Sequence, residues 1–336
     1  MSPKKNKIRK LIFFVTNRCN YRCNHCFYWK SLNKEEVMSF DEIKKIADSI
    51  GKLNTLLISG GEPFLRKDLA EICEYFIQKN KTKLISVPTN GSMKEEALAF
   101  VHRLHHQCKL RIYVSIEGLK ETHNRIRGLD CYDHSIELLK ALVELKKECN
   151  FTPMAMITVS NQNYEEISVI AKVLNEIGVH YSITPVRGTP KDSKFRAPTA
   201  EEWESLVKEL RQHRTFYGNN YSFNNNKTNI LKNTHRKIAM RSLTKMYCSA
   251  LNGKRGFICD AGLNTAVLDY DGKVFLCELT ASIGTIKDYD YDFNRLWFSP
   301  EAELRRTQIT KCVCTHACFI NTKYMRSVEW LSQLLS

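Results

Sequence analysis

The sequence lacks the long apolar runs that membrane segments need. No stretch approaches the roughly 18 to 20 apolar residues of a membrane-spanning helix, and the basic amino terminus, MSPKKNKIRK, is not followed by the apolar core of a signal peptide. We therefore expect a cytoplasmic protein without a membrane partner. Without a secretion signal, its 13 cysteines argue against a disulfide framework and favour metal binding in a reducing compartment.

The bulk composition is that of a folded, basic protein. With 336 residues, 43% of them hydrophobic, the chain is large enough for one large α/β domain and a smaller appendage. Its formal net charge of +15 makes an anionic partner plausible, although charge says nothing about the fold.

Six short apolar or β-branched segments predict strands, at 11–16, 55–59, 84–87, 110–115, 153–159 and 179–186. Helical patterns lie between them. One begins with a capping box from Ser39 to Glu42, and another runs from Asn163 and stops at Gly178. Six β-α units in series predict a parallel sheet with right-handed crossovers. Because six units are fewer than a closed barrel's eight, we expect an α/β fold of the partial (β/α)6 TIM-like type.

Unusual polar groups fall just past the end of every predicted strand. In chain order they are NRCNYRC, SGGEP, PTNG, SIEG, TVSNQN and TPVRG. In a parallel β/α barrel the carboxyl ends of the strands meet at one rim, and the active site is built there. The sequence therefore predicts an active site at this rim.

The first motif carries Cys19, Cys23 and Cys26 on one short loop. Three thiolates at this spacing can converge on one iron-sulfur cube, which normally takes four, so one iron is left open for a small molecule. The alternative is a zinc site made of these three cysteines and His25. We interpret Cys73, Cys108, Cys131 and Cys149 as small hydrophobic residues.

A second cysteine group lies near the carboxyl end. The turn signal Asp271-Gly272 predicts a hairpin that brings Cys259 and Cys277 to neighbouring ends. The later segment CVCTHAC would complete the site, so the candidate ligands are Cys259, Cys277, Cys312, Cys314 and Cys318, with Cys248 as a sixth cysteine nearby. The sequence does not separate Cys312 from Cys314 as ligand, nor an iron-sulfur cluster from structural zinc.

These motifs resemble a known family. The pattern C-x3-C-x2-C, followed by an aromatic residue and later by GGEP, resembles the cluster loop of radical S-adenosylmethionine (radical SAM) enzymes. The segment from Gly272 to Cys277, G-x4-C, with the later cysteines resembles the SPASM/twitch extension of such enzymes. It departs from the seven-cysteine SPASM pattern, which favours one auxiliary 4Fe-4S cluster over two.

The resemblance implies cofactors and roles for the rim residues. It implies a 4Fe-4S cluster that binds S-adenosyl-L-methionine, and an electron donor such as flavodoxin or ferredoxin. Glu62 would accept the ammonium group of the methionine moiety, and Arg127, or its neighbour Arg125, would bind the carboxylate. The full set of cofactor-binding candidates is His25, Phe27, Gly60, Gly61, Glu62, Asn90, Ser115, Glu117 and Arg127.

Composition shifts suggest three parts of the chain: residues 1–195 as the radical SAM core, 196–255 as a helical and basic linker, and 256–336 as the SPASM/twitch-like domain with a terminal helix at 324–335. The linker would hold a helix at 199–214 and an Asn-rich surface loop or lid at 219–229. Residues 227–259 contain eight Lys or Arg and no Asp or Glu.

The resemblance implies an enzyme that abstracts hydrogen from a polar or anionic small molecule and so oxidises, epimerises or joins carbon centres. The alternative is the maturation of a ribosomal peptide, although no winged-helix extension precedes the first strand. A tRNA-modifying enzyme fits less well, since we find no RNA-binding module or interleaved stacking aromatics, and we do not expect a nucleic-acid partner. A non-enzymatic metal-cluster scaffold is the remaining alternative.

Overall fold

The computed structural model describes residues 7–34, 37–210, 244–254, 259–309, 312–316 and 319. Its described strands form one sheet of nine, in the order β6-β5-β4-β3-β2-β1-β7-β8-β9. The first six are mutually parallel and appear in the chain as β1 (Lys10–Thr16), β2 (Thr55–Gly60), β3 (Leu84–Thr89), β4 (Lys109–Ser115), β5 (Thr152–Val159) and β6 (His180–Pro185). The predicted partial (β/α)6 barrel is confirmed, because β6 ends the sheet without pairing back to β1.

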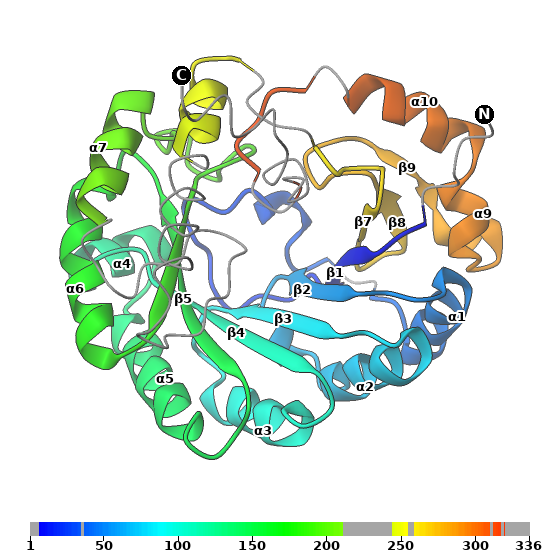
Figure 1. The fold of residues 1–336 in the computed structure, drawn as a ribbon, viewed down its shortest axis with the longest axis horizontal. Coiled ribbons are helices and arrows are strands. Elements are labelled where there is room, and N and C mark those ends of the chain that lie inside the picture. The colour runs from blue at the N-terminus through cyan, green and yellow to red at the C-terminus, as the bar shows by residue number, and fades with distance from the viewer. Residues whose placement is uncertain are drawn as a thin grey trace, which may run out of the picture.

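Helices follow the strands and lie along the outer side of the curved sheet, as Figure 1 shows. They are α1 (Phe40–Ile50), α2 (Leu69–Asn80), α3 (Lys94–Leu104), α4 (Lys120–Arg127), α5 (Tyr132–Leu145), α6 (Ile167–Ile177) and α7 (Ala200–Leu210). Short 3-10 turns lie at Trp29–Ser31, Pro63–Leu65 and Tyr164–Glu166, and residues 244–251 are also helical.

The start of α1 is fixed by its sequence. The Ser39 hydroxyl accepts a hydrogen bond from the Glu42 amide, and the Glu42 carboxylate accepts one from the Ser39 amide, so the predicted capping box is present. Two of the amides at the helix amino end are thereby satisfied. The apolar face of α1 then packs into the main core between sheet and helices, with Ile43 and Ile46 fully buried.

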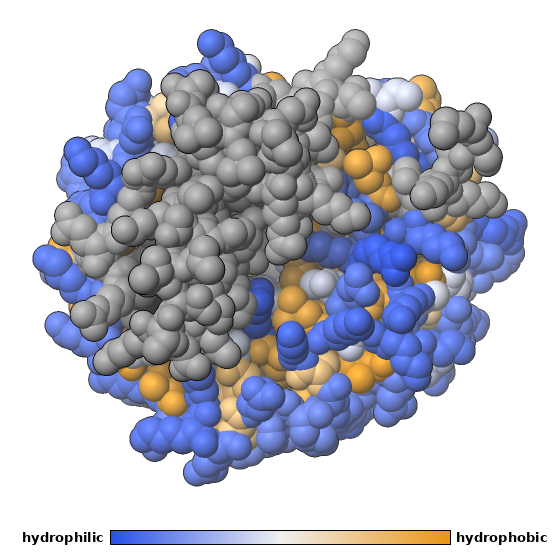
Figure 2. Space-filling model, viewed as in Figure 1, coloured by the Kyte–Doolittle hydropathy of each residue, from blue (hydrophilic) through white to orange (hydrophobic). Residues whose placement is uncertain are grey.

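The inner side of the sheet faces a cavity rather than the core. Along β4 the buried residues alternate with Arg111, Tyr113 and Ser115, which line the cavity. This alternation follows from the two-residue period of a strand. Figure 2 shows apolar residues near the middle of the face in view, with hydrophilic residues around its edge.

The carboxyl-terminal part extends the same sheet. β7 (Thr265–Leu268) pairs in parallel with β1, and β8 (Lys273–Phe275) and β9 (Ser282–Thr285) follow as antiparallel strands. The predicted hairpin is confirmed, with Gly272 in its turn at a φ of +91°. A 3-10 turn (Ile286–Tyr289) and two helices, α9 (Phe293–Trp297) and α10 (Pro300–Ile309), complete this part.

Some predicted segments lie wholly or partly outside the described residues. The Asn-rich segment 219–229, the terminal helix 324–335 and most of the basic stretch 227–259 belong to this group. The helix predicted at 199–214 is present as α7 up to Leu210, where the description stops. Among the described helices, none combines the length and the apolar character that crossing a membrane requires.

We predict that Ser39→Ala lowers the thermal unfolding midpoint. Loss of an N-cap costs about 1 kcal/mol, which for a chain of this size corresponds to roughly 1 to 3 °C. Differential scanning calorimetry would measure the shift. Ser39→Thr keeps the hydroxyl acceptor and should stay near the wild-type midpoint, so an equal loss in both variants would contradict the role of the cap.

Candidate active site

The three cysteines of the first motif line one cavity of about 340 Å³. They lie on the loop that follows β1, where Cys26 donates its amide proton to the Cys23 carbonyl at 3.2 Å. The cavity is also lined by Gly60, Gly61 and Glu62 from the end of β2 and the turn that follows it. The structure therefore brings the first two rim motifs together on one surface.

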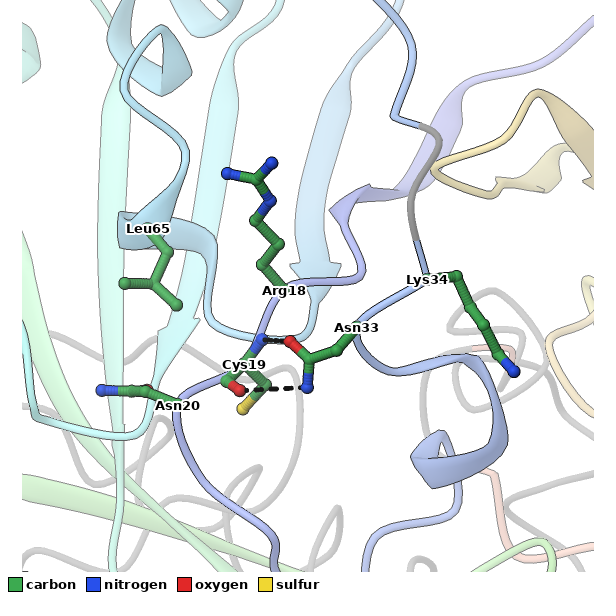
Figure 3. A pocket seen from close by; sticks show the side chains of 6 residues that line it. All are labelled: Arg18, Cys19, Asn20, Asn33, Lys34 and Leu65. Atoms are coloured by element: carbon green, nitrogen blue, oxygen red, sulfur yellow. Dashed lines mark hydrogen bonds between the residues drawn. The ribbon is translucent and has the colours of Figure 1, made fainter.

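The outer side of the cluster loop is held by Asn33, as Figure 3 shows. Its side chain accepts a hydrogen bond from the Cys19 amide at 3.1 Å and donates one to the Cys19 carbonyl at 3.3 Å. These residues, with Arg18, Lys34 and others, line a shallow surface depression of about 490 Å³. In the view the Cys19 sulfur points away from the Arg18 side chain, so the basic groups flank the loop without blocking the thiol.

Two other loops fix the cluster loop from its inner side. The segment after β6 pairs with it, because the Lys191 amide donates to the Cys26 carbonyl at 3.1 Å and the Asp192 amide to the Asn24 carbonyl at 2.9 Å. The end of α4 does the same, with the Asn24 amide donating to the Ile126 carbonyl at 2.8 Å. Backbone contacts from the loop after β6 and from the end of α4 thus hold the cluster loop in place.

Burial keeps the thiols of Cys19 and Cys26 protonated in the absence of a metal. Burial is the largest cause that raises the pKa of Cys19, to about 11, and that of Cys26, to about 12. Within the part of the chain that the structure describes, no three His, Cys, Asp or Glu side chains lie close enough to share one metal ion. A metal group at this site must therefore stabilise the thiolates that form when the protons leave, and it must reach sulfurs that a single ion cannot bridge. These requirements fit a cluster better than a single zinc ion.

Gly60 and Gly61 allow close approach of two backbones. A Cβ on Gly60 would lie 2.2 Å from the Thr16 carbonyl oxygen, and a Cβ on Gly61 would lie 2.1 Å from that of Arg18. The family resemblance implies that both glycines bind the cofactor. The structure shows another reason for glycine at these two positions, because the second rim motif packs directly against the backbone of β1 and the cluster loop.

Glu62 is a buried carboxylate with three donors. It accepts hydrogen bonds from the Thr89 hydroxyl at 2.9 Å, the Asn90 amide at 2.7 Å and the Phe64 amide at 3.2 Å. Burial nevertheless outweighs these bonds and raises the pKa of Glu62 to about 7. A cationic group beside it would lower that pKa and would be bound in return.

Arg127 joins the cysteine loop to Glu117. Its guanidinium pairs with the Glu117 carboxylate and lies 3.6 Å from the Cys23 sulfur, while its buried Nε has no hydrogen-bond partner among the described residues. Glu117 also holds the Thr158 amide, at 2.8 Å. His25 Nε2 is 3.7 Å from the same carboxylate, and burial lowers the pKa of His25 to about 4, so its imidazole is neutral at pH 7.

The sequence-predicted cofactor residues mostly share the cavity, with one exception. Glu117 is buried behind the cavity and paired with Arg127, and it is absent from the cavity lining. The alternative arginine, Arg125, lies at the exposed surface and donates to Gln162. The candidates that do line the cavity are His25, Phe27, Gly60, Gly61, Glu62, Asn90, Ser115 and Arg127.

The second cysteine set also converges in part. Cys277, two residues after β8, lies near enough to Cys259 and Cys314 for their charges to affect its pKa, and Cys314 lies beside Cys312. Burial raises the pKa of Cys314 to about 11. Cys312 is exposed, whereas Cys277 is buried. Cys318 lies outside the described residues.

Sequence reasoning missed a buried charge group beside this set. Arg187 Nη2 lies 2.7 Å from the Glu278 carboxylate, and His316 Nε2 lies 2.5 Å from the same oxygen. The three residues come from the loop after β6, the residue after Cys277 and the segment after Cys314, and all line the cavity. Arg187 belongs to the rim motif TPVRG, but nothing in the sequence indicates its partners.

Cys131 also lies closer to the site than the sequence suggests. It is buried with Tyr21 and Cys23 in a small cluster of its own, against which Cys19 and Cys26 pack. It packs against the cysteine loop, which is compatible with its interpretation from the sequence as a small hydrophobic residue. The sequence offered no sign of this proximity.

A buried carboxylate and three thiols that line one cavity at the carboxyl edge of parallel strands are typical of a cofactor-dependent enzyme site. Residues 13–174 match the family model of the Radical SAM superfamily. The chain is 30% identical to Fe-coproporphyrin III synthase of Methanosarcina barkeri (strain Fusaro / DSM 804) over 178 residues, which are 51% of this chain and 42% of that protein. It is 25% identical to GTP 3',8-cyclase of Aquifex aeolicus (strain VF5) over 283 residues, which are 80% of this chain and 82% of that protein.

The fold resembles that of Streptococcus suis SuiB bound to precursor peptide SuiA, with a TM-score of 0.64, 14% identity, and coverage of 92% of this chain and 71% of SuiB. At this identity the likeness shows the fold alone. The chain spans about half the length of several curated relatives that it matches. The matched residues, 13–174, are just under half of the chain and form a radical SAM domain, and a domain of this family implies a 4Fe-4S cluster and the binding of S-adenosylmethionine.

We predict that Gly61→Ala lowers the iron content of anaerobically reconstituted protein, because the added Cβ collides with the Arg18 carbonyl oxygen and displaces the cluster loop. Iron per chain would be measured by a colorimetric chelator assay. Gly178→Ala is the matched control: Gly178 has a φ of +81° with nothing within 4 Å of the added Cβ, so that variant carries only about 1 to 3 kcal/mol of backbone strain. Full iron content in Gly61→Ala would contradict the prediction.

Proposed function

We propose that this chain is a radical SAM enzyme whose first cluster is bound by Cys19, Cys23 and Cys26 and whose substrate is a polar or anionic small molecule held inside the partial barrel. The observation that carries the proposal is that these three thiols and the buried carboxylate of Glu62 line one cavity. The match of residues 13–174 to the radical SAM family model supplies the identity of the cofactors.

The residues on the cavity wall fit S-adenosylmethionine. Glu62 would accept the ammonium group, since its carboxylate is buried and no cation is paired with it among the described residues. The unpaired Nε of Arg127 would donate to the methionine carboxylate. Phe27 offers a ring beside the last thiol, with the Arg187 guanidinium 4.8 Å from its centroid on one side. When bound, the two cofactors supply one-electron cleavage of the sulfonium and a 5'-deoxyadenosyl radical.

The contribution of the chain itself is placement and exclusion of water. A primary carbon radical reacts with whatever lies beside it, so the wall must hold the substrate carbon at the rim and keep solvent out. Burial of Glu62 and Arg127, together with the partial burial of His25, provides that environment. Neutral His25 shields the cluster loop without adding a charge.

We expect the reduced, reconstituted protein to convert S-adenosylmethionine to 5'-deoxyadenosine and methionine. Cys19→Ser, Cys23→Ser and Cys26→Ser should each abolish the product, because a loop with two thiolates no longer holds the cluster. Anaerobic incubation with dithionite followed by liquid chromatography measures it. Cys108→Ser, at the opposite end of β4, should keep wild-type turnover. Absence of 5'-deoxyadenosine from iron-loaded wild type would instead favour a metal-cluster scaffold.

Peptide maturation is the second candidate function. The observation that favours it is the likeness over 92% of this chain to a protein whose structure holds a precursor peptide. The two functions differ in the substrate that raises 5'-deoxyadenosine formation above the level without substrate. A short peptide encoded beside the gene would do so in the second case, and a small anionic metabolite in the first.

For the second cysteine set we propose one auxiliary 4Fe-4S cluster near the substrate end of the cavity. Cys259, Cys277 and Cys314 lie within electrostatic range of one another, which favours Cys314 over the exposed Cys312 as a ligand. The cluster would act as electron acceptor or structural support. Structural zinc is the competing occupant.

Metal analysis of the reconstituted chain tests this proposal. Two cubes require about eight irons per chain, and Cys277→Ser should reduce the count to about four. Cys312→Ser should change it little if Cys314 is the ligand. About four irons and one zinc in the wild type, measured by inductively coupled plasma mass spectrometry, would contradict an auxiliary iron-sulfur cluster.

A further inference from the structure

The cavity contains one arginine without a counter-charge. Arg111 lies on β4 with its side chain on the cavity wall, and within the described ranges the structure gives it no hydrogen bond or ion pair. The other two arginines of the lining, Arg127 and Arg187, are paired with Glu117 and Glu278. An arginine stays charged at any accessible pH and is costly to hold in a partly enclosed site without a partner.

The position of Arg111 is set by the strand register. Ser86 of β3, Arg111 of β4 and Thr152 of β5 stand side by side in the sheet. Leu57 of β2 pairs with Ser86, and Ile12 of β1 with Leu57, so one layer crosses five strands. All five residues line the cavity and form its floor. Two residues with hydroxyl groups therefore flank Arg111 in the sheet, and no acidic residue belongs to this layer.

The floor lies well below the rim that holds the thiols. Ser115, at the end of β4, is four residues above Arg111, which at about 3.3 Å per residue is roughly 13 Å along the strand. Between them the wall carries Tyr113 and Met154, and Met156 stands beside Ser115. The only carboxylates in the described lining, Glu62 and Glu278, belong to the rim.

Parts of the chain outside the described residues offer little to neutralise Arg111. Residues 211–243, the longest of these segments, contain no Asp or Glu. Because the described chain supplies no negative charge beside Arg111, we expect a ligand that enters the cavity to supply it. Guanidinium binds carboxylate and phosphate through two parallel hydrogen bonds, and adjacent hydroxyls can donate to the same oxygens.

We infer that Arg111, with Ser86 and Thr152, forms an oxyanion subsite at the cavity floor that binds a carboxylate or phosphate group of the substrate. The substrate is then a molecule with an apolar or aromatic body against Tyr113, Met154 and Met156 and one anionic end. This orientation rests on the proposed function, since the reacting carbon must lie at the rim, beside the cluster loop. The subsite specifies the substrate class, which the radical chemistry alone does not.

The test uses four probes of one size that differ in charge: benzoate, phenyl phosphate, benzyl alcohol and benzamidine. Each is titrated calorimetrically into the anaerobically reconstituted, S-adenosylmethionine-bound protein. We expect the two anions to bind and the neutral and cationic probes to bind at least about tenfold more weakly, as loss of a charged hydrogen bond predicts. The stronger of the two anions identifies carboxylate or phosphate as the substrate group.

Variants assign the binding to Arg111. Arg111→Met should weaken the anions by about tenfold or more, and Arg111→Lys should retain part of the affinity because it keeps the charge without the paired geometry. Lys172→Leu, an exposed cation on the outside of α6, should bind the anions as wild type does. Thermal midpoints within error of wild type show that the variants are folded.

Equal anion affinity in wild type and Arg111→Met overturns the subsite, as does wild type that binds none of the probes or does not prefer the anions. The outcome is separable from that of the proposed function. Cleavage of S-adenosylmethionine without substrate depends on the rim thiols, so 5'-deoxyadenosine formation by the wild type tests the radical chemistry separately from anion binding. A wild type that binds anions through Arg111 but forms no 5'-deoxyadenosine would refute the radical chemistry and leave the subsite standing.

Discussion

The site depends on the close contact between two backbone segments at the ends of β1 and β2. The Gly61 amide donates to the Thr16 carbonyl and the Glu62 amide to the Arg18 carbonyl, both at 2.8 Å. This contact exists only because positions 60 and 61 have no Cβ. It places the loop of thiols directly against the turn that presents the buried carboxylate, so the ligands of a cluster and of an ammonium group share one wall. Without it, the motifs would be neighbours in the sheet but would not form one site.

The arginine side chains of the cavity are paired at its rim but not at its floor in the described structure. Near the rim, each cation is matched by an acid from another part of the chain, as in the pairs of Arg127 with Glu117 and of Arg187 with Glu278. Such pairs fix the geometry of the loops, because separating one leaves a buried charge uncompensated. Arg111, at the floor, has no such match in the described structure. We therefore interpret the paired arginines as residues that hold the loops in place and Arg111 as a residue that binds substrate.

The carboxyl-terminal extension is part of the same sheet as the barrel. β7 adds to the free edge of β1, and the Tyr28 hydroxyl, just past the cysteine loop, donates to the Asp269 carboxylate just after β7. Burial raises the pKa of Asp269 to about 6. Glu278 and His316 then reach the cavity from the extension. The second cysteine set is thereby fixed relative to the first through continuous backbone pairing.

The sequence by itself determined the local elements and the chemistry of the rim. Strand alternation, the Ser39 capping box and the Asp271-Gly272 turn depend on residues close together in the chain, so their pattern is legible without a structure. The spacing of the thiols is local in the same sense. The parallel order of six strands then followed from the repeated β-α units and the fixed hand of their crossovers.

Only the tertiary structure decided which distant groups meet. That β7 pairs with β1, that Glu278 and His316 face Arg187, and that Arg111 stands on the cavity floor all depend on register and curvature across several strands. Glu117, read from its motif as a cofactor residue, lies behind the wall because Arg127 holds it there. Such contacts join residues far apart in the chain, and no periodicity or motif spacing records which of the many polar groups on a rim will be buried together.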